Sequence, residues 1–185
     1  MKKIPLLTLS VALLASTSWA HTIQNGAPLP TASVTEHGEL TLKDKDLVYA
    51  NWQTEQLPGK VRVIQAIAGR SSAKEMNAPL MDAITAADFD DARYQTTTII
   101  NQDDAMWGTG GFVKSSAEDS KREFSWSSIV LDENGSVAKA WRLKEESALI
   151  AVLDEKGMVR FVKEGKLSED EVNQVVSLVA ELVNQ

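Results

Sequence analysis

A near-continuous apolar run lies about one third of the way along the chain, at Val61–Ala68. Only Arg62 and Gln65 interrupt it, so we predict a central strand that is covered on both faces. Residues 38–42 instead alternate polar and apolar side chains, the pattern of a half-buried edge strand. Pro58 and Gly59 predict a turn between the two segments.

Two later segments repeat apolar residues at the spacing of an amphipathic helix. The first runs from Ser71 to about Ala87, and its Pro79 is expected to kink it or to lie near its first turns. The second begins at Ser168, which can form a capping box with Glu171. We expect this last helix to pack on a sheet, because its apolar residues share one face. They are Val172, Val175, Val176, Val179, Leu182 and Val183.

The remaining pattern supplies the other elements of an α/β domain. It predicts strands at 96–100 and 128–131, a helix at 112–124, and a hairpin of 149–153 and 158–162. Residues 21–35 are expected to be extended and irregular, and 103–111 to form a loop. The order of elements is that of a thioredoxin-like fold, with a central mixed β-sheet flanked by helices.

The first twenty residues have the pattern of a secretory signal. Lys2 and Lys3 precede a mostly apolar run, and Ser18 and Ala20 occupy the two positions that signal peptidase reads. We expect cleavage after Ala20, leaving a single domain at 21–185 in the periplasm. The apolar run is too short to span a bilayer, so no stable membrane anchor is expected after signal removal.

Charge and cysteine content exclude several classes of function. The formal net charge is −7, and removal of Lys2 and Lys3 would make it more negative. Nucleic acids and anionic lipid surfaces need Lys and Arg for binding, so both are disfavoured as partners. The chain has no cysteine. Thiol–disulfide exchange needs a thiolate, so no oxidoreductase activity of that kind is expected.

The turn between the apolar strand and the first helix is the strongest candidate for a site. Thioredoxin-type oxidoreductases carry their Cys-x-x-Cys here, and the corresponding residues are Gly69, Arg70, Ser71 and Ser72. Free N–H groups at a helix start favour an anion, and Arg70 could contact a carboxylate or phosphate. The alternative is that Ser71 or Ser72 caps the helix and Arg70 lies on the surface. We predict no catalytic residue, because Ser72 has only His21 and His37 as possible bases.

Other candidate features favour structural interpretations. His21, as a mature N-terminus, could chelate copper together with His37, but a mobile terminus is the simpler reading, and we expect no metal or cofactor. The glycines at 108–111 lack the Gly-Lys-Ser/Thr of a phosphate-binding loop, so a flexible loop is expected. Four tryptophans are expected in or near the core, although together they could line a peptide groove. They are Trp52, Trp107, Trp126 and Trp141.

The chain resembles the YtfJ family of bacterial periplasmic proteins over essentially its whole length. The resemblance rests on residues 59–63, 68–75, 93–99, 108–113, 145–147 and 152–154. It implies a thioredoxin-like fold and a periplasmic location. Thioredoxin-like redox proteins also place a cis proline before the hairpin, near Ala148 here, and no proline follows Pro79. Both halves of the redox site are therefore missing.

These observations favour a non-redox binding or interaction module. Its partner would be a periplasmic protein, a peptide or a small anion, recognised by the face that carries the turn. A non-redox enzyme or a metal-binding protein that uses the turn or His21 is the second hypothesis. A third is an accessory component that supports a cysteine-bearing redox partner.

Overall fold

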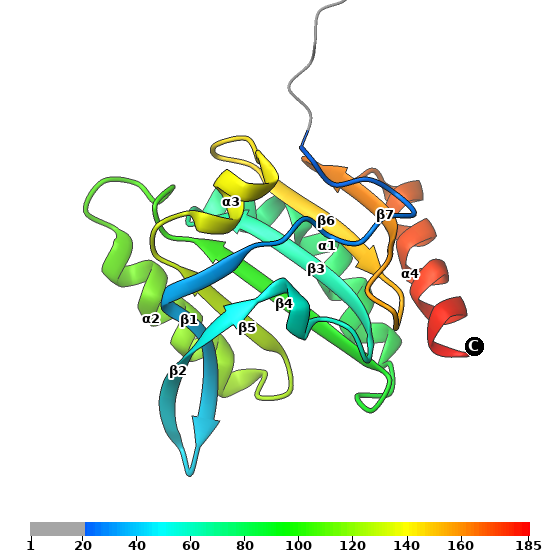
Figure 1. The fold of residues 1–185 in the computed structure, drawn as a ribbon, viewed down its shortest axis with the longest axis horizontal. Helices are drawn as coiled ribbons and strands as arrows, with labels where there is room; N and C mark the ends of the chain where they lie inside the picture. The colour runs from blue at the N-terminus through cyan, green and yellow to red at the C-terminus, as the bar shows by residue number, and fades with distance from the viewer. Residues whose placement is uncertain (1–20) are drawn as a thin grey trace, which may run out of the picture.

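A seven-stranded mixed sheet in the order β2-β1-β5-β4-β3-β6-β7 forms the centre of the molecule (Figure 1). The computed structural model describes residues 21–185; the predicted signal lies outside the described residues. Strands β3, β4 and β5 pair in parallel, and all other neighbours pair antiparallel. The strands are β1 (Ser33–Lys43), β2 (Asp46–Gln53), β3 (Val61–Ala68), β4 (Tyr94–Asn101), β5 (Ser128–Asp132), β6 (Ala148–Leu153) and β7 (Val159–Glu164).

Helices cover both faces of this sheet. Three of them, α1 (Ser71–Ala87), α2 (Gly110–Glu123) and α4 (Glu169–Val183), lie behind the sheet in the view of Figure 1. The short α3 (Ser136–Trp141) and the irregular segment that follows His21 cover the opposite face. No helix within residues 21–185 is long and apolar enough to cross a bilayer.

Strand β3 is buried on both faces, as its apolar run predicts. Ile64 and Ala66 face the cluster that contains Trp141 of α3, whereas Val61 and Val63 face α1 and α4. β3 pairs with β4 on one side and β6 on the other. The turn at Gly69 follows the carboxyl end of this buried strand, and α1 begins directly after it.

The C-terminal helix packs as its apolar stripe predicts. Val175 and Val179 are fully buried against the sheet, and Val176 packs at the margin of the same cluster. The capping box is present: the Glu171 N–H donates to Ser168 Oγ at 3.3 Å, and the Ser168 N–H donates to a Glu171 carboxylate oxygen at 2.7 Å. Lys163 Nζ adds an ion pair to the same carboxylate at 2.6 Å. The helix is therefore fixed at its start and along its face.

Several local predictions need correction. β1 is an interior strand between β5 and β2, and the unpredicted β2 forms the edge. β1 still alternates, because Leu40 is buried under α2 while neighbouring side chains face outward. Pro79 lies well inside α1 rather than in its first turns. Gly110 and Gly111 form the start of α2 instead of belonging to the preceding loop. The helix α3 was not predicted, because six residues are too few to show a helical repeat of apolar positions.

Candidate functional site

The predicted turn is held tightly at the carboxyl end of β3. The Gly69 N–H donates to the Asn101 carbonyl at 2.8 Å, and a Cβ on Gly69 would lie 2.8 Å from the same oxygen. Arg70 is the N-cap residue of α1, and no side chain caps the helix. The alternative in which Ser71 or Ser72 caps α1 is therefore wrong. Both serines are exposed in the first turn.

Arg70 is engaged within the protein on several sides. Its Nε donates to the Asp104 carbonyl at 2.9 Å and to Asp104 Oδ1 at 3.1 Å, and one terminal nitrogen lies 3.0 Å from Oδ1. The other terminal nitrogen lies 3.1 Å from Glu146 Oε1. The Glu146 N–H in turn donates to Asp104 Oδ2 at 2.6 Å. Arg70 thus joins the α1 turn to two distant loops, and an incoming anion would compete with two carboxylates.

A long groove runs from this turn between α1 and α2. We call it the α1–α2 groove; its volume is about 1190 Å³, and Gly69, Arg70, Ser71 and Ser72 line one end of it. It exists because α1 packs on β3 and β6 while α2 packs on β1 and β5. Neither helix packs mainly on β4, so side chains of this strand form the floor between them. Among the lining residues are Thr96, Thr98 and Ile100 of β4, Met81 of α1, and Phe112 and Ser116 of α2.

Large apolar side chains are exposed mainly along this groove. Phe112 is 77% exposed and Trp126 is 53% exposed, and both line the groove together with Met106 and Phe124. The rings of Phe124 and Trp126 form an edge-to-face pair with centroids 5.6 Å apart. Outside the groove, only Val48 and Trp107 are comparably exposed among residues 21–185. Exposed apolar side chains gathered along one groove are typical of interaction sites.

The floor of the groove carries polar side chains as well as isoleucines. Gln65 Nε2 donates to Thr98 Oγ1 at 2.9 Å, and the Tyr94 hydroxyl and Thr96 Oγ1 share a hydrogen bond of the same length. Burial raises the pKa of the Tyr94 phenol, which therefore stays protonated even in mildly alkaline solution. Hydroxyl and amide groups beneath apolar walls can orient a ligand while the walls supply contact area.

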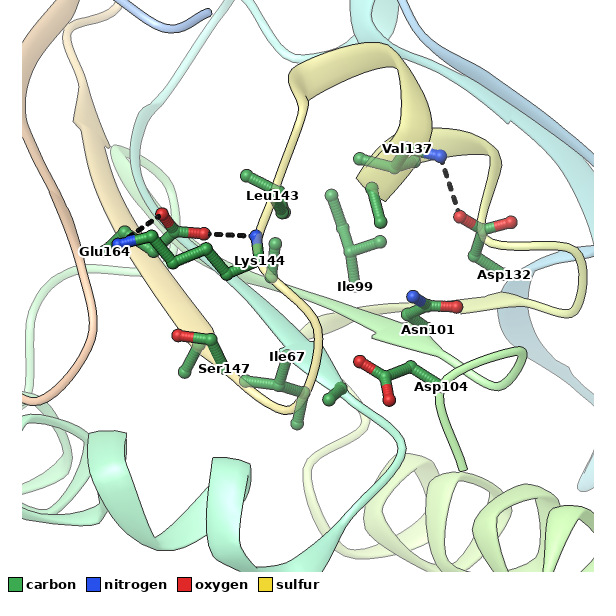
Figure 2. A pocket seen from close by; sticks show the side chains of 14 residues that line it. Ile67, Ile99, Asn101, Asp104, Asp132, Val137, Leu143, Lys144, Ser147 and Glu164 are labelled. Atoms are coloured by element: carbon green, nitrogen blue, oxygen red, sulfur yellow. Dashed lines mark hydrogen bonds and ion pairs between the residues drawn. The ribbon is translucent and has the colours of Figure 1, made fainter. Parts of the chain in front are cut away.

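A second, much smaller cavity lies on the other face, at the carboxyl ends of β3 and β4 (Figure 2). Its volume is about 20 Å³, enough for roughly one water molecule. Figure 2 shows Glu164 bonded to Lys144 and Asp132 bonded to Val137 at its margins. Ala148 begins β6 beside it, and the described residues contain no cis peptide bond. This cavity is too small to hold a substrate.

Neither histidine of residues 21–185 lines the α1–α2 groove. His37 Nδ1 lies 2.8 Å from Glu133 Oε2 at the β1–β5 pairing, three strands away from the end of β3 that leads to the turn. Residues 21–185 contain no group of three or more His, Cys, Asp or Glu side chains placed to hold a metal ion.

The tryptophan prediction is half right. Trp52 and Trp141 are core residues, as expected, but Trp107 is 100% exposed and Trp126 lies at the groove. The four indoles do not line one groove, because Trp52 and Trp141 belong to the cluster on the opposite face. Sequence analysis also missed Phe112. The partly buried Val113 and the buried Ala117 are four apart, so Phe112 lies off that stripe, which is a signal of an apolar residue facing outward.

Comparisons with known proteins agree with this architecture. The family described as "Bacterial protein of unknown function (YtfJ_HI0045)" matches residues 23–182. An uncharacterized protein of Haemophilus influenzae is 46% identical over 97% of this chain and 97% of its own length. The uncharacterized protein YtfJ of Escherichia coli is 46% identical over 96% of this chain and 97% of its own length.

Solved thioredoxin-like structures share the fold. The crystal structure of a thiol-disulfide isomerase from Corynebacterium glutamicum aligns with 87% of this chain and 98% of that one, with a TM-score of 0.55 and 19% identity. At that identity the likeness concerns the fold alone. The cysteines that such chemistry needs have no counterpart in this chain.

Proposed function

The chain belongs to the YtfJ_HI0045 family of bacterial proteins, and we propose that it is an exported, non-redox binding module built on a thioredoxin-like fold. Export to the periplasm is supported by the basic start, the short apolar run and the small residues before His21. The binding role is supported chiefly by one observation. The surface that carries the cysteine-free turn continues into an open groove lined by exposed apolar side chains.

The arrangement of charged groups favours binding over catalysis. Arg70 is neutralised by Asp104 and Glu146, and no imidazole lies at the groove, since both histidines of residues 21–185 are placed elsewhere. A nucleophile at Ser72 would lack an imidazole to activate it. What the groove offers is apolar contact area with hydroxyl and amide groups beneath it, which suits recognition.

Site-specific photocrosslinking in intact bacteria tests the proposal. The full chain, including residues 1–20, would carry a photoreactive amino acid either at Phe112 in the groove or at Val48 on edge strand β2. Both positions are exposed, and Val48 does not line the groove. We expect a discrete adduct from position 112 that is absent from position 48. It should also disappear when Trp126 is replaced by serine, in a variant that circular dichroism shows to be folded at the growth temperature.

Equal adducts at both positions, or none at position 112, would contradict the binding role of the groove. The export part is checked separately by intact-mass analysis of protein recovered from the periplasm. Cleavage before His21 is expected, and a retained Trp19-Ala20 would contradict it.

A further inference from the structure

The width of the α1–α2 groove limits what can fill it. The midlines of the two helices are about three strand spacings apart, because α1 covers β3 and β6 while α2 covers β1 and β5. At about 4.8 Å per spacing this separation is about 14 Å. Helices in contact lie about 8–10 Å apart, and a third helix between them would need about 16–20 Å. The α1–α2 groove is therefore wide enough for one extended chain but too narrow for a third helix.

The length and volume of the groove also favour an extended chain as its ligand. Its floor extends along β4 from Tyr94 to Ile100. At about 3.3 Å per residue this run is about 20 Å long, the length of roughly six extended residues. The groove volume of about 1190 Å³ exceeds the range of about 300–1000 Å³ typical of small-molecule pockets.

An extended chain also brings backbone groups that need hydrogen-bond partners. The floor offers Gln65, Thr96 and Thr98, and the walls offer Thr85 and Ser116. These groups can satisfy a peptide backbone while Phe112 and Trp126 contact its apolar side chains. The floor groups already bond in pairs, Gln65 with Thr98 and Tyr94 with Thr96. A purely apolar ligand, such as a lipid chain, would remove water from their remaining donors and acceptors without replacing it.

Charge distinguishes the two ends of the groove. Lys74 lies near the turn, whereas Asp82, Asp88 and Asp91 line the opposite end. Neither Asp82 nor Asp88 forms an ion pair within residues 21–185. Lys60 Nζ donates to the backbone carbonyl of Asp91 and places a positive charge beside that residue. The unpaired negative charge at this end of the groove is therefore that of Asp82 and Asp88. A ligand that spans the groove meets uncompensated negative charge at this end.

We infer that the α1–α2 groove binds an extended peptide segment of about six residues, with apolar side chains and a Lys or Arg at the end beside Asp82 and Asp88. This inference rests on the proposed binding role and adds the class of ligand. Contacts between the peptide main chain and the floor would supply affinity that does not depend on the peptide sequence. The apolar walls would select bulky side chains, and the carboxylates would determine the direction in which the peptide binds.

Fluorescence anisotropy with labelled synthetic octapeptides tests it. The probes alternate leucine or phenylalanine with serine and carry two lysines at one end or the other. The matched control peptides carry two glutamates instead. We expect one lysine peptide to bind about tenfold tighter than its glutamate counterpart at low ionic strength, with the preference shrinking at high salt.

Two variants assign the contacts. The double variant Asp82→Asn, Asp88→Asn should abolish the lysine preference and leave binding of an uncharged peptide within about twofold. Phe112→Ser should weaken all the peptides. Equal affinity for lysine and glutamate peptides, or binding that Phe112→Ser leaves intact, would overturn the inference. A groove adduct at position 112 in cells without binding of any peptide would overturn the peptide assignment alone. Absence of both would remove the proposed function as well.

Discussion

The two flanks of α1 differ in how completely they are closed. On one flank, α1 and α4 pack together over β3 and β6, and Leu80, Val175 and Val179 are almost inaccessible to solvent. On the other, α1 faces α2 across the open groove, where Phe112 and Trp126 remain exposed. The same helix thus belongs to the folded core on one side and to a candidate binding surface on the other. Stability and function are expected to separate along this line.

The largest effect is expected in the closed flank. Leu80→Ala removes a side chain that is buried between α1 and the sheet. The lost burial and the remaining cavity should lower the free energy of unfolding by about 2–5 kcal/mol. Urea denaturation followed by circular dichroism measures this. A loss below about 1 kcal/mol would show that this flank is not closely packed.

The next largest effect is expected at Arg70, where the two flanks meet the turn. Arg70→Ala leaves Asp104, whose side chain is only 10% exposed, without its cation. We expect a loss of about 1–3 kcal/mol in the free energy of unfolding. Arg122→Ala is the matched control, since its pair with Asp119 is exposed and should contribute under about 0.5 kcal/mol. If both variants have the same stability, Arg70 is free to serve a ligand instead.

A smaller, pH-dependent effect is expected at the start of α4. The hydrogen bond from Lys163, with that from the Ser168 backbone, lowers the pKa of Glu171 from 4.5 to about 2. Because the folded pKa is the lower one, this stabilisation is complete above about pH 4.5 and is lost as the pH falls toward 2. Thermal unfolding of the wild type and Glu171→Gln should differ at pH 6 and converge near pH 2. A constant difference would contradict the assignment.

The smallest effect on stability is expected in the open flank. Phe112→Ser alters a mostly exposed side chain and should change the free energy of unfolding by no more than about 0.5 kcal/mol. Trp126→Ser also removes the edge-to-face contact with Phe124 and should lower it by about 0.5–1.5 kcal/mol. Both should nevertheless weaken ligand binding. Differential scanning calorimetry beside the anisotropy assay separates the two quantities. A large drop in melting temperature would mean that the aromatic residues belong to the core.

The closed flank was largely predictable from sequence, and the open one was not. The bounds of α1 and the packing of α4 follow from local periodicity and from the Ser168 cap. Both signals lie within the sequence of the helix itself. The groove depends on which strands α2 covers, and no local pattern encodes that choice. The ion pairs of Arg70 were equally hidden, because Asp104 and Glu146 lie 34 and 76 residues away in sequence. Arg70 was accordingly expected either to contact an anionic ligand or to lie on the surface, whereas it links three segments.

Trp126 illustrates the same limit. A large aromatic residue next to a strand is typical of a core, and that expectation holds for Trp52 and Trp141. Trp126 is exposed because it follows Phe124 in the connection that leaves α2, before β5 begins at Ser128. Its partner in contact is Phe124, not the core.

Hydrogen–deuterium exchange of residues 21–185, with and without the preferred lysine peptide, tests the central claim most directly. The peptide should slow exchange in segments 81–91 and 110–127, which border the groove, and leave 169–183 in α4 unchanged. Protection of α4 to the same extent, or no protection of either groove segment at a saturating peptide concentration, would contradict the division of α1 into a structural flank and a binding flank.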